Sequence, residues 1–430
     1  MQPQTSESWP LYRRVFFRFL FLYFILYLLG FPVSQFVPFL GFIDTLTWPV
    51  VNGAVEWFNS LMGFFDHPLV PVNGSGDTSW AWTFLALCLT LAAIGAVVWS
   101  LIPRAPKSHP RLEYLLWNAG RYFLAYFAFS YGIIKVFALQ MGFPTLSTMA
   151  TPLGDLLPMR LSWQFMGYST SYQVFAGLME VAVAMLLLYR RTVTLGLFVG
   201  FGVFLNVMML NLSYDVPVKI FSTHLTVISL LLLIPDLDRI FSFFIFNRPV
   251  ASQVRHFFST QKKYMRVSRW VYKAAFIFLL TMGVMDVYGW YEQEKNAPQP
   301  FAYGVYDVQT VIRNGDTIPV LASDTLVWKD VIFDRNSMVS VGTTDTLLRQ
   351  GYRRGYFNYA RDSAAGVLKC FKYERMDSIP LFNISYRMTP SGMDLATVIR
   401  GDSVRMNLVR SKRHFQLAER QFHWLSEYNR

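Results

Sequence analysis

The chain contains seven long apolar runs, and their lengths restrict the folds open to it. An α-helix needs about 20 apolar residues to cross the roughly 30 Å hydrocarbon core of a bilayer. Hydrophobic residues make up 53% of the 430 residues and charged residues only 15%. Soluble domains carry about 25% charged residues. We therefore expect an α-helical polytopic membrane protein with about seven transmembrane helices, at residues 19–31, 80–102, 114–140, 171–189, 192–211, 219–234 and 270–290.

The first run follows three arginines, and residues 32–35 after it offer no small-residue cleavage site for a signal peptidase. We therefore expect an uncleaved first span. Residues 32–78 contain no lysine or arginine but several aromatic residues. This pattern favours an exposed connector with an amphipathic interfacial helix near residues 51–65.

Cations in the connecting segments predict the orientation of the chain. The N-terminus, residues 103–113, the pair Arg190-Arg191 and residues 236–269 are basic, and they alternate with connectors that hold almost no cations. Lysine and arginine accumulate in cytoplasmic loops. We therefore expect a cytoplasmic N-terminus and an extracytoplasmic C-terminal region. This distribution also accounts for the net charge of +12, so no nucleic-acid partner is expected.

Residues 291–430 change from long apolar runs to short alternating segments. Asn314-Gly315-Asp316 is typical of a hairpin turn, and short strand-like runs continue as far as residues 414–417. Eight or nine such strands predict an all-β antiparallel barrel or sandwich. Its interior can hold an apolar ligand or be filled by side chains, and at this size we expect a filled core.

The pattern divides the chain into four regions. Two spans and the interfacial helix occupy residues 1–113, and four helices occupy residues 114–235. A basic cytoplasmic loop and the seventh span follow at 236–290, and the extracytoplasmic β-rich domain occupies 291–430.

The third run carries two cations, Arg121 and Lys135, which lie on one face of a helix. A cation near the bilayer centre costs roughly 2.5–3.5 kcal/mol, so both should face the protein interior and find partners. Glu180 lies in the middle of the fourth run and is the expected counter-charge. A structural ion pair is the alternative to a functional site, particularly for Arg121.

Other polar residues are expected to join this pair in a nest that opens outward between the third and sixth spans. Intramembrane ionisable groups often mark a functional site, so we predict catalytic roles for Lys135, Glu180 and His224. For Asp215 and Lys219, which flank Pro217, the alternative to a functional role is capping of a loop. The predicted cofactor-binding residues are Arg121, Tyr131, Asn211, Tyr214, Asp215 and Lys219.

Metal and disulfide chemistry are not expected. His224 is the only histidine inside the apolar runs, and no HxxxH or ExxH spacing accompanies it. Cys88 and Cys370 are expected in different compartments, so we predict no disulfide between them.

Residues 114–235 carry a combination of motifs found in one group of bacterial membrane proteins. Arg121 and Gly132-Ile133-Ile134-Lys135 lie on the first helix, Gly177-Leu178-Met179-Glu180 on the second, and Arg190-Arg191 in the turn that follows. This combination resembles the DoxX-like family, whose members have a four-helix core. The resemblance implies a bacterial inner-membrane protein with a DoxX-like core, membrane redox work and a quinone as candidate cofactor.

These observations lead to one preferred function and two alternatives. The preferred function is a quinone- or lipophile-binding subunit of an envelope redox system, with Lys135 and Glu180 orienting the head group. His224, with Tyr131 or Tyr214, would then move protons. The first alternative is a non-enzymatic anchor that presents the β-domain to a periplasmic partner protein. A membrane lyase similar to vitamin-K-carboxylase-like bundles is more distant.

Overall fold

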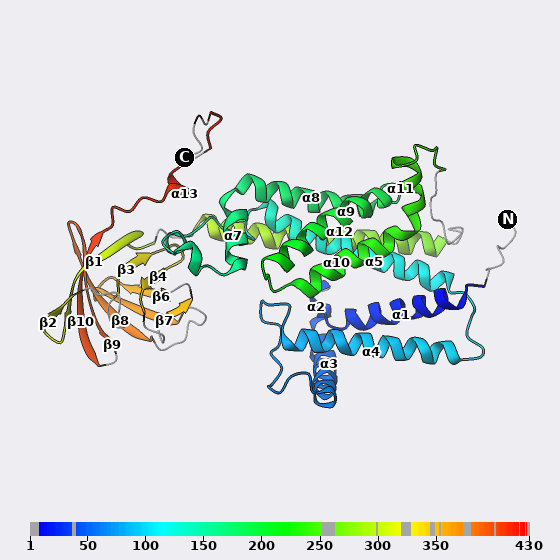
Figure 1. Ribbon diagram of the computed structural model, residues 1–430, viewed down its shortest axis with the longest axis horizontal. Coiled ribbons are helices and arrows are strands. Elements are labelled where there is room, and N and C mark those ends of the chain that lie inside the picture. The colour runs from blue at the N-terminus through cyan, green and yellow to red at the C-terminus, as the bar shows by residue number, and fades with distance from the viewer. Residues whose placement is uncertain are drawn as a thin grey trace. The chain divides into compact units, whose positions relative to one another are not determined.

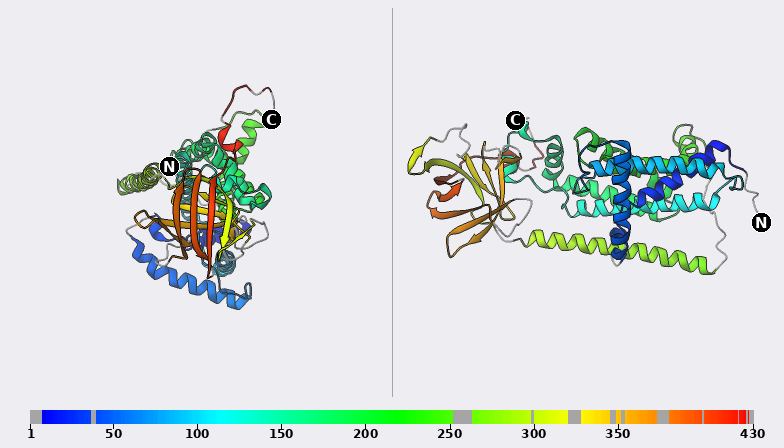
Figure 2. Two further views of the ribbon diagram at one scale, coloured as in Figure 1. Left: turned by 90° about the vertical axis from the view of Figure 1, so that its left-hand side faces the viewer. Right: turned by 90° about the horizontal axis from the view of Figure 1, so that it is seen from below.

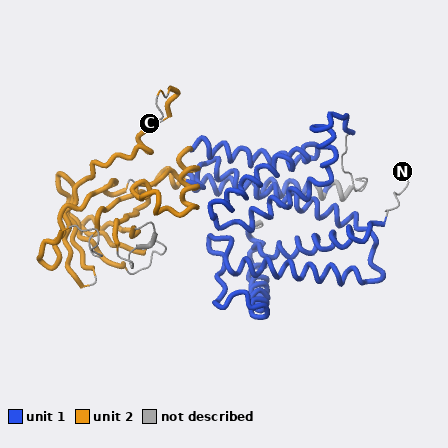
Figure 3. Tube along the Cα trace, viewed as in Figure 1, with its two compact units in different colours: residues 1–141, 170–291 blue, residues 142–169, 292–430 orange. Residues whose placement is uncertain are grey.

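The computed structural model describes residues 8–36, 40–251, 263–297, 300–319, 328–344, 349–351, 354–372, 380–399, 401–420, 422–425 and 427. The chain divides into two compact units, which are coloured separately in Figure 3. Residues 1–141 and 170–291 form the helical unit. Residues 142–169 and 292–430 form the second unit, so two segments distant in sequence build it together.

Long helices make up the helical unit (Figure 1). They are α1 (Leu11–Leu28), α3 (Gly41–Met62), α4 (Ser79–Leu101), α5 (Pro110–Val136), α8 (Thr170–Leu188), α9 (Val193–Ser213), α10 (Lys219–Leu233) and α12 (Lys263–Lys295). Shorter elements connect them: α2 (Val33–Phe36), the 3₁₀ turn η3 (Ile234–Asp236) and α11 (Leu237–Phe244).

Five helices among the described residues are long and apolar enough to cross a membrane. They comprise α4, α8, α9, α10 continued through α11, and residues 270–295 of α12. The chain is therefore a multi-pass membrane protein, with five rather than seven helices meeting this criterion. The other two predicted spans also form helices, but α1 carries three arginines and α5 carries Arg121 and Lys135.

Both of these less apolar helices lie antiparallel to an apolar neighbour. Near the middle of α5, Arg121 donates to the carbonyl of Leu187, close to the C-terminal end of α8. Just beyond the C-terminal end of α5, the backbone N–H of Met141 donates to the side chain of Gln173, near the start of α8. α1 lies along α4 in the same way, since Arg18 bonds Ser100 and a Cβ on Gly30 would meet the ring of Phe84.

The helix α3 runs across the direction of α4 and α5 (Figure 2). It contacts α4 at Trp80, whose indole N–H donates to Asn52 at 2.7 Å and whose ring stacks on Trp48. Phe42 and Trp57 of α3 are exposed. The expected amphipathic helix is therefore present, and it begins earlier in the chain than residue 51. Its direction and exposed aromatic residues are typical of an interfacial helix.

The C-terminal domain is a closed antiparallel barrel of eight strands (Figures 1 and 2). The barrel closes where the last strand pairs with the first, from Tyr306 opposite Arg410 to Arg313 opposite Val404. Closure leaves the barrel strands no free edge, which explains why a barrel forms rather than an open sandwich. In order the strands are β1 (Gly304–Arg313), β3 (Asp330–Phe333), β4 (Met338–Gly342), β6 (Arg354–Asp362), β7 (Val367–Lys372), β8 (Phe382–Thr389), β9 (Gly392–Ile399) and β10 (Asp402–Arg410), with β2 (Asp316–Ile318) beside β1 and β5 (Arg349–Gly351) beside β6.

Large side chains occupy the barrel interior, as expected for a filled core. Trp328, Phe333 and Phe357 are each at most 1% exposed. The strand expected at residues 414–417 is wrong, because a short helix, α13 (Gln416–Glu419), forms there instead. The carboxylate of Glu419 accepts the N–H of residue 415, and the closed barrel offers no edge to a further strand.

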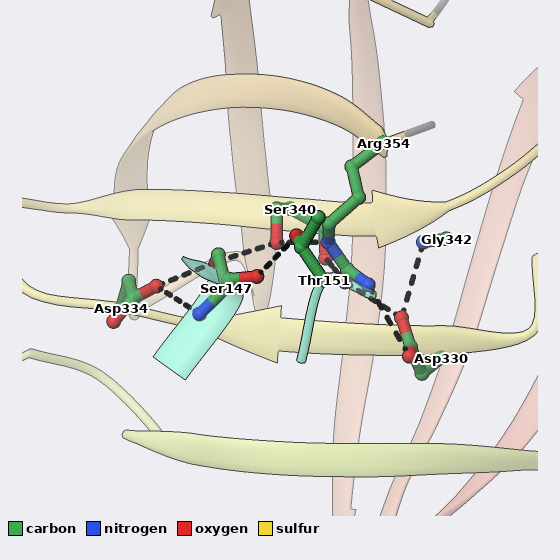
Figure 4. A network of polar contacts seen from close by, with 7 residues as sticks. All are labelled: Ser147, Thr151, Asp330, Asp334, Ser340, Gly342 and Arg354. Carbon is green, nitrogen blue, oxygen red and sulfur yellow. Dashed lines mark hydrogen bonds and ion pairs between the residues drawn. The ribbon is translucent and has the colours of Figure 1, made fainter. Parts of the chain in front are cut away.

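Residues 142–169 form part of the second unit through α6 (Leu146–Met149), the 3₁₀ turn η2 (Leu153–Asp155) and α7 (Pro158–Tyr168). Figure 4 shows the polar contacts between α6 and the barrel. The fully buried carboxylate of Asp334 accepts the N–H groups of Leu146 and Ser147 and the hydroxyl of Ser147. This hydroxyl also lies 2.6 Å from that of Ser340, which accepts a hydrogen bond from Arg354.

Candidate functional site

A cavity of about 780 Å³ lies among α1, α4, α5 and α10 in the helical unit. Its walls are mainly apolar and include Leu20, Phe24, Leu85 and Ile228. Ligand pockets commonly measure about 300–1,000 Å³ and combine apolar walls with a few polar groups. The cavity therefore has the size and lining of a site for a lipophilic molecule.

One wall of the cavity carries a hydrogen-bonded pair, Tyr23 of α1 and His224 of α10. The tyrosine hydroxyl lies 2.5 Å from Nε2 of the imidazole. Nδ1 of the same ring lies 2.7 Å from the carbonyl oxygen of Ile220, one turn earlier in α10. The ring of Tyr27 stacks on the imidazole with centroids 3.9 Å apart and planes 2° from parallel. These contacts fix the imidazole in position and orientation.

A second polar group lies at the cytoplasmic end predicted for these helices. Arg13 donates to Glu113 at 3.0 Å, and both residues line the cavity together with Tyr114. Their side chains are 49% and 36% exposed, so the ion pair contributes at most about 1 kcal/mol to stability. The ion pair forms part of the cavity wall, and because its two charges compensate each other it places no unpaired charge there.

Lys135 and Glu180 form the expected pair, between α5 and α8. Nζ lies 2.7 Å from both carboxylate oxygens, and the two side chains are 9% and 7% exposed. The ring of Tyr131 lies 5.8 Å from the ammonium group. Among the described residues that line the cavity, neither member of this pair is included.

Two glycines explain how this ion pair can form. A Cβ on Gly177 would lie 2.6 Å from the carbonyl oxygen of Gly132, and one on Gly132 would lie 2.9 Å from that of Gly177. The backbones of α5 and α8 are therefore in direct contact at this point. Lys135 and Glu180 each follow their glycine by one helical turn, so the close approach brings their side chains together.

Arg121 has a different environment, at the C-terminal end of α8. Its Nε and a terminal nitrogen donate to the carbonyls of Leu187 and Leu188, at 2.5 and 2.9 Å. The last carbonyls of a helix lack partners within the helix and carry partial negative charge, so a cation satisfies them well. This geometry matches the structural alternative for Arg121.

Lys219 and Asp215 belong to the capping of α10. Lys219 Nζ lies 2.7 Å from Asp215 and 3.7 Å from Asp77. The Asp77 carboxylate accepts the backbone N–H groups of Lys219 and Ile220, at 2.7 and 3.0 Å, which is the arrangement of an N-cap. This geometry therefore matches the loop-capping alternative for Asp215 and Lys219.

The remaining two candidates lie at the end of α9. Asn211 is buried and its carbonyl accepts the N–H of Val216, whereas Tyr214 is the C-cap residue and is exposed. The structure thus separates the predicted nest into the Lys135–Glu180 pair with Tyr131, the Arg121 cap, the group around Lys219, and His224 at the cavity.

Tyr23 and Tyr27 are not among the site residues predicted from the sequence, although both contact the imidazole of His224. They are four residues apart and therefore share a helix face. This spacing is a signal in the sequence that could have identified a polar face on the first span. No group of three or more potential metal ligands occurs among the residues that the structure describes.

Comparison with known proteins gives one relationship. No family model matches the chain, and neither does any solved structure. Over 116 residues the sequence is 36% identical to a Bacillus subtilis (strain 168) protein described as "Uncharacterized protein YwoB", covering 73% of that protein. The chain belongs to the YwoB family. The region shared with YwoB is 27% of this chain, so most of the chain lies outside it.

Proposed function

We propose that this member of the YwoB family binds a lipophilic molecule in the cavity among α1, α4, α5 and α10. The observation that carries the proposal is an apolar cavity of about 780 Å³ with the Tyr23–His224 pair in its wall. Polar groups within a largely apolar pocket orient a bound ligand. An ionisable residue within a membrane is energetically costly, and its presence there therefore suggests a functional site.

A quinone, the cofactor suggested by the resemblance to DoxX-like proteins, fits these residues. The apolar walls suit a hydrocarbon tail, and Tyr23 and Thr223 provide polar contacts for a head group, with His224 holding the Tyr23 hydroxyl in place. A bound quinone would supply two-electron redox chemistry, as part of an envelope redox system in the bacterial inner membrane. The chain would bind and orient the head group and hold a proton between Tyr23 Oη and His224 Nε2.

In this proposal Lys135 and Glu180 do not contact the ligand. Their mutual 2.7 Å contacts and the adjacent Gly132–Gly177 approach make them a connection between α5 and α8. His224 retains a role at the ligand, with Tyr23 as its partner in place of Tyr131 or Tyr214.

The experiment blocks the cavity with one large side chain. Val227→Trp adds an indole to a residue of the lining, whereas Val97→Trp makes the same change on α4 at a residue outside the described lining. Binding of a short-chain quinone to protein in lipid nanodiscs is followed by quenching of tryptophan fluorescence or by native mass spectrometry. We expect at least a 10-fold loss of affinity in Val227→Trp and none in Val97→Trp. Unchanged binding in a folded Val227→Trp protein would refute the proposal.

A second candidate function is a membrane anchor for the barrel. It is favoured because two separate chain segments, residues 142–169 and 292–430, form the second unit. Its two segments connect to the helical unit at residues 141–142, 169–170 and 291–292. Three chain connections would hold the barrel at the membrane surface for a periplasmic partner. Under this alternative, crosslinking from the barrel in native membranes would capture the same partner with the wild type and with Val227→Trp.

A further inference from the structure

The hydrogen bonds of His224 determine which of its ring nitrogens carries a proton. A backbone carbonyl oxygen can only accept a hydrogen bond, so the 2.7 Å contact with Ile220 places a proton on Nδ1. In a neutral imidazole the other nitrogen then has no proton. Nε2 is therefore an acceptor, and the hydroxyl of Tyr23 donates to it across 2.5 Å.

This arrangement fixes what the pair offers to a ligand. The one hydroxyl proton of Tyr23 is already used in the bond to His224, and Tyr27 covers a face of the imidazole. The lone pairs of the Tyr23 oxygen remain available, and these can only accept a hydrogen bond. A ligand that carries a hydroxyl group can donate to this oxygen while the Tyr23–His224 bond stays intact.

We propose that the cavity selects lipophiles with a hydroxyl head group, such as alkylphenols and the reduced, hydroquinone form of a quinone. The inference rests on the proposed function of the cavity. A ketone or ether of the same shape presents only acceptors, so it must face the Tyr23 oxygen unpaired or break the Tyr23–His224 bond. An unpaired buried acceptor is unfavourable.

Thr223 lines the same cavity and does not reverse this preference. A threonine hydroxyl can donate or accept, so it serves either class of ligand. A hydroxyl ligand can donate to Tyr23 and accept from Thr223 at once. A carbonyl or ether ligand can use only the second of these contacts.

The test compares two stable ligands that differ in one donor. 4-Nonylphenol carries the hydroxyl, and 4-nonylanisole replaces it with a methyl ether. Binding is measured with the full-length protein in nanodiscs, and partition into the lipid is subtracted with the Val227→Trp protein. One neutral hydrogen bond corresponds to roughly a 3- to 10-fold difference, so we expect the phenol to bind tighter by that factor.

The outcomes separate the two proposals. If neither compound binds, the proposed function fails and this inference falls with it. If both bind equally, or the ether binds tighter, only the preference for hydroxyl ligands is overturned. Since this comparison uses the wild-type protein, it does not depend on the folding of a site variant.

A variant then tests the source of the preference. His224→Phe keeps an aromatic ring against Tyr27 but removes the acceptor, so the Tyr23 hydroxyl becomes free to donate. We expect the preference for the phenol to fall to about 1-fold or to invert. Tyr126→Phe removes a tyrosine hydroxyl that donates to Gln35 and should keep the wild-type ratio. A folded His224→Phe protein that retains the full preference would contradict the inference.

Discussion

Lys135 and Glu180 form a buried ion pair in which the two charges compensate each other. Removal of one partner leaves an uncompensated charge in the bundle, which costs about 3–5 kcal/mol. We expect Glu180→Gln or Lys135→Met to lower the free energy of unfolding by roughly 3 kcal/mol, measured by unfolding in mixed micelles. The double variant Lys135→Met/Glu180→Met should recover most of this loss. Additive losses in the double variant would show that the two charges are independent.

Ligand binding provides a second readout of the same variants. Because the pair lies outside the described lining of the cavity, the folded fraction of each single variant should bind the ligand with wild-type affinity. Loss of binding in a folded protein would return Lys135 or Glu180 to the ligand site.

Cys370 in the barrel core should be chemically silent at neutral pH. Burial raises the pKa of its thiol to about 12, well above its ordinary value. The thiol therefore favours folding below about pH 9, and this contribution is lost as the pH rises toward 12, because only the unfolded chain can ionise there. In a Cys88→Ala background, maleimide should label Cys370 at pH 7 only after unfolding. Rapid labelling of the native protein would contradict the buried placement.

At the scale of elements, the contact between α5 and α8 depends on Gly132 and Gly177. A Cβ on Gly177 would lie 2.6 Å from a carbonyl oxygen, and backbone cannot move aside as a flexible side chain does. We expect Gly177→Ala to destabilise the protein by about 1–3 kcal/mol, the range for overpacking. Gly202→Ala in α9 is the matched control, since its Cβ would meet nothing within 4 Å. This control should be neutral or stabilising by up to about 1 kcal/mol, because alanine favours helix.

The helices and most strands were predictable because their signals are local. Run length defines the membrane helices, and Asn314-Gly315 defines the first hairpin, where both residues have positive φ. Glu180 was identifiable as the partner of Lys135 because it is the one carboxylate in the middle of an apolar run. The contacts of His224 were not predictable, since the sequence of a single apolar run does not determine which helices lie side by side in a bundle. Its contact with Tyr23 joins residues 201 positions apart.

Asp334 connects distant parts of the second unit, so its loss should be visible at the scale of the whole molecule. Asp334→Ala removes the acceptor for two backbone N–H groups and the Ser147 hydroxyl. We expect residues 142–169 to become sensitive to limited proteolysis, with barrel stability lowered by roughly 2–4 kcal/mol. Asp362→Ala, at the end of β6 where its side chain accepts the N–H of Ala365 in the following turn, should leave the digestion pattern unchanged. An unaltered pattern in Asp334→Ala would mean that other contacts hold this segment.

The composition of the second unit also constrains membrane topology. Residues 142–169 and the barrel form one unit, so both must lie on the same side of the membrane. The chain between them passes through α8, α9, α10 and α12, and four crossings return it to that side. Because α5 lies antiparallel along α8, it should cross as well and place residues 102–109 on the opposite side. The positive charges of that loop predict that the opposite side is the cytoplasm.

Cysteine labelling in intact cells distinguishes the arrangements. In a background without native cysteines, we expect an impermeant maleimide to label Gly154→Cys and Ser363→Cys directly. Ala105→Cys should be labelled only after the membrane is permeabilised. If α5 did not cross, Ala105→Cys would be labelled together with the other two. If the whole orientation were inverted, Ala105→Cys alone would react from outside. Seven crossings with an extracytoplasmic barrel thus predict one labelling pattern that neither alternative shares.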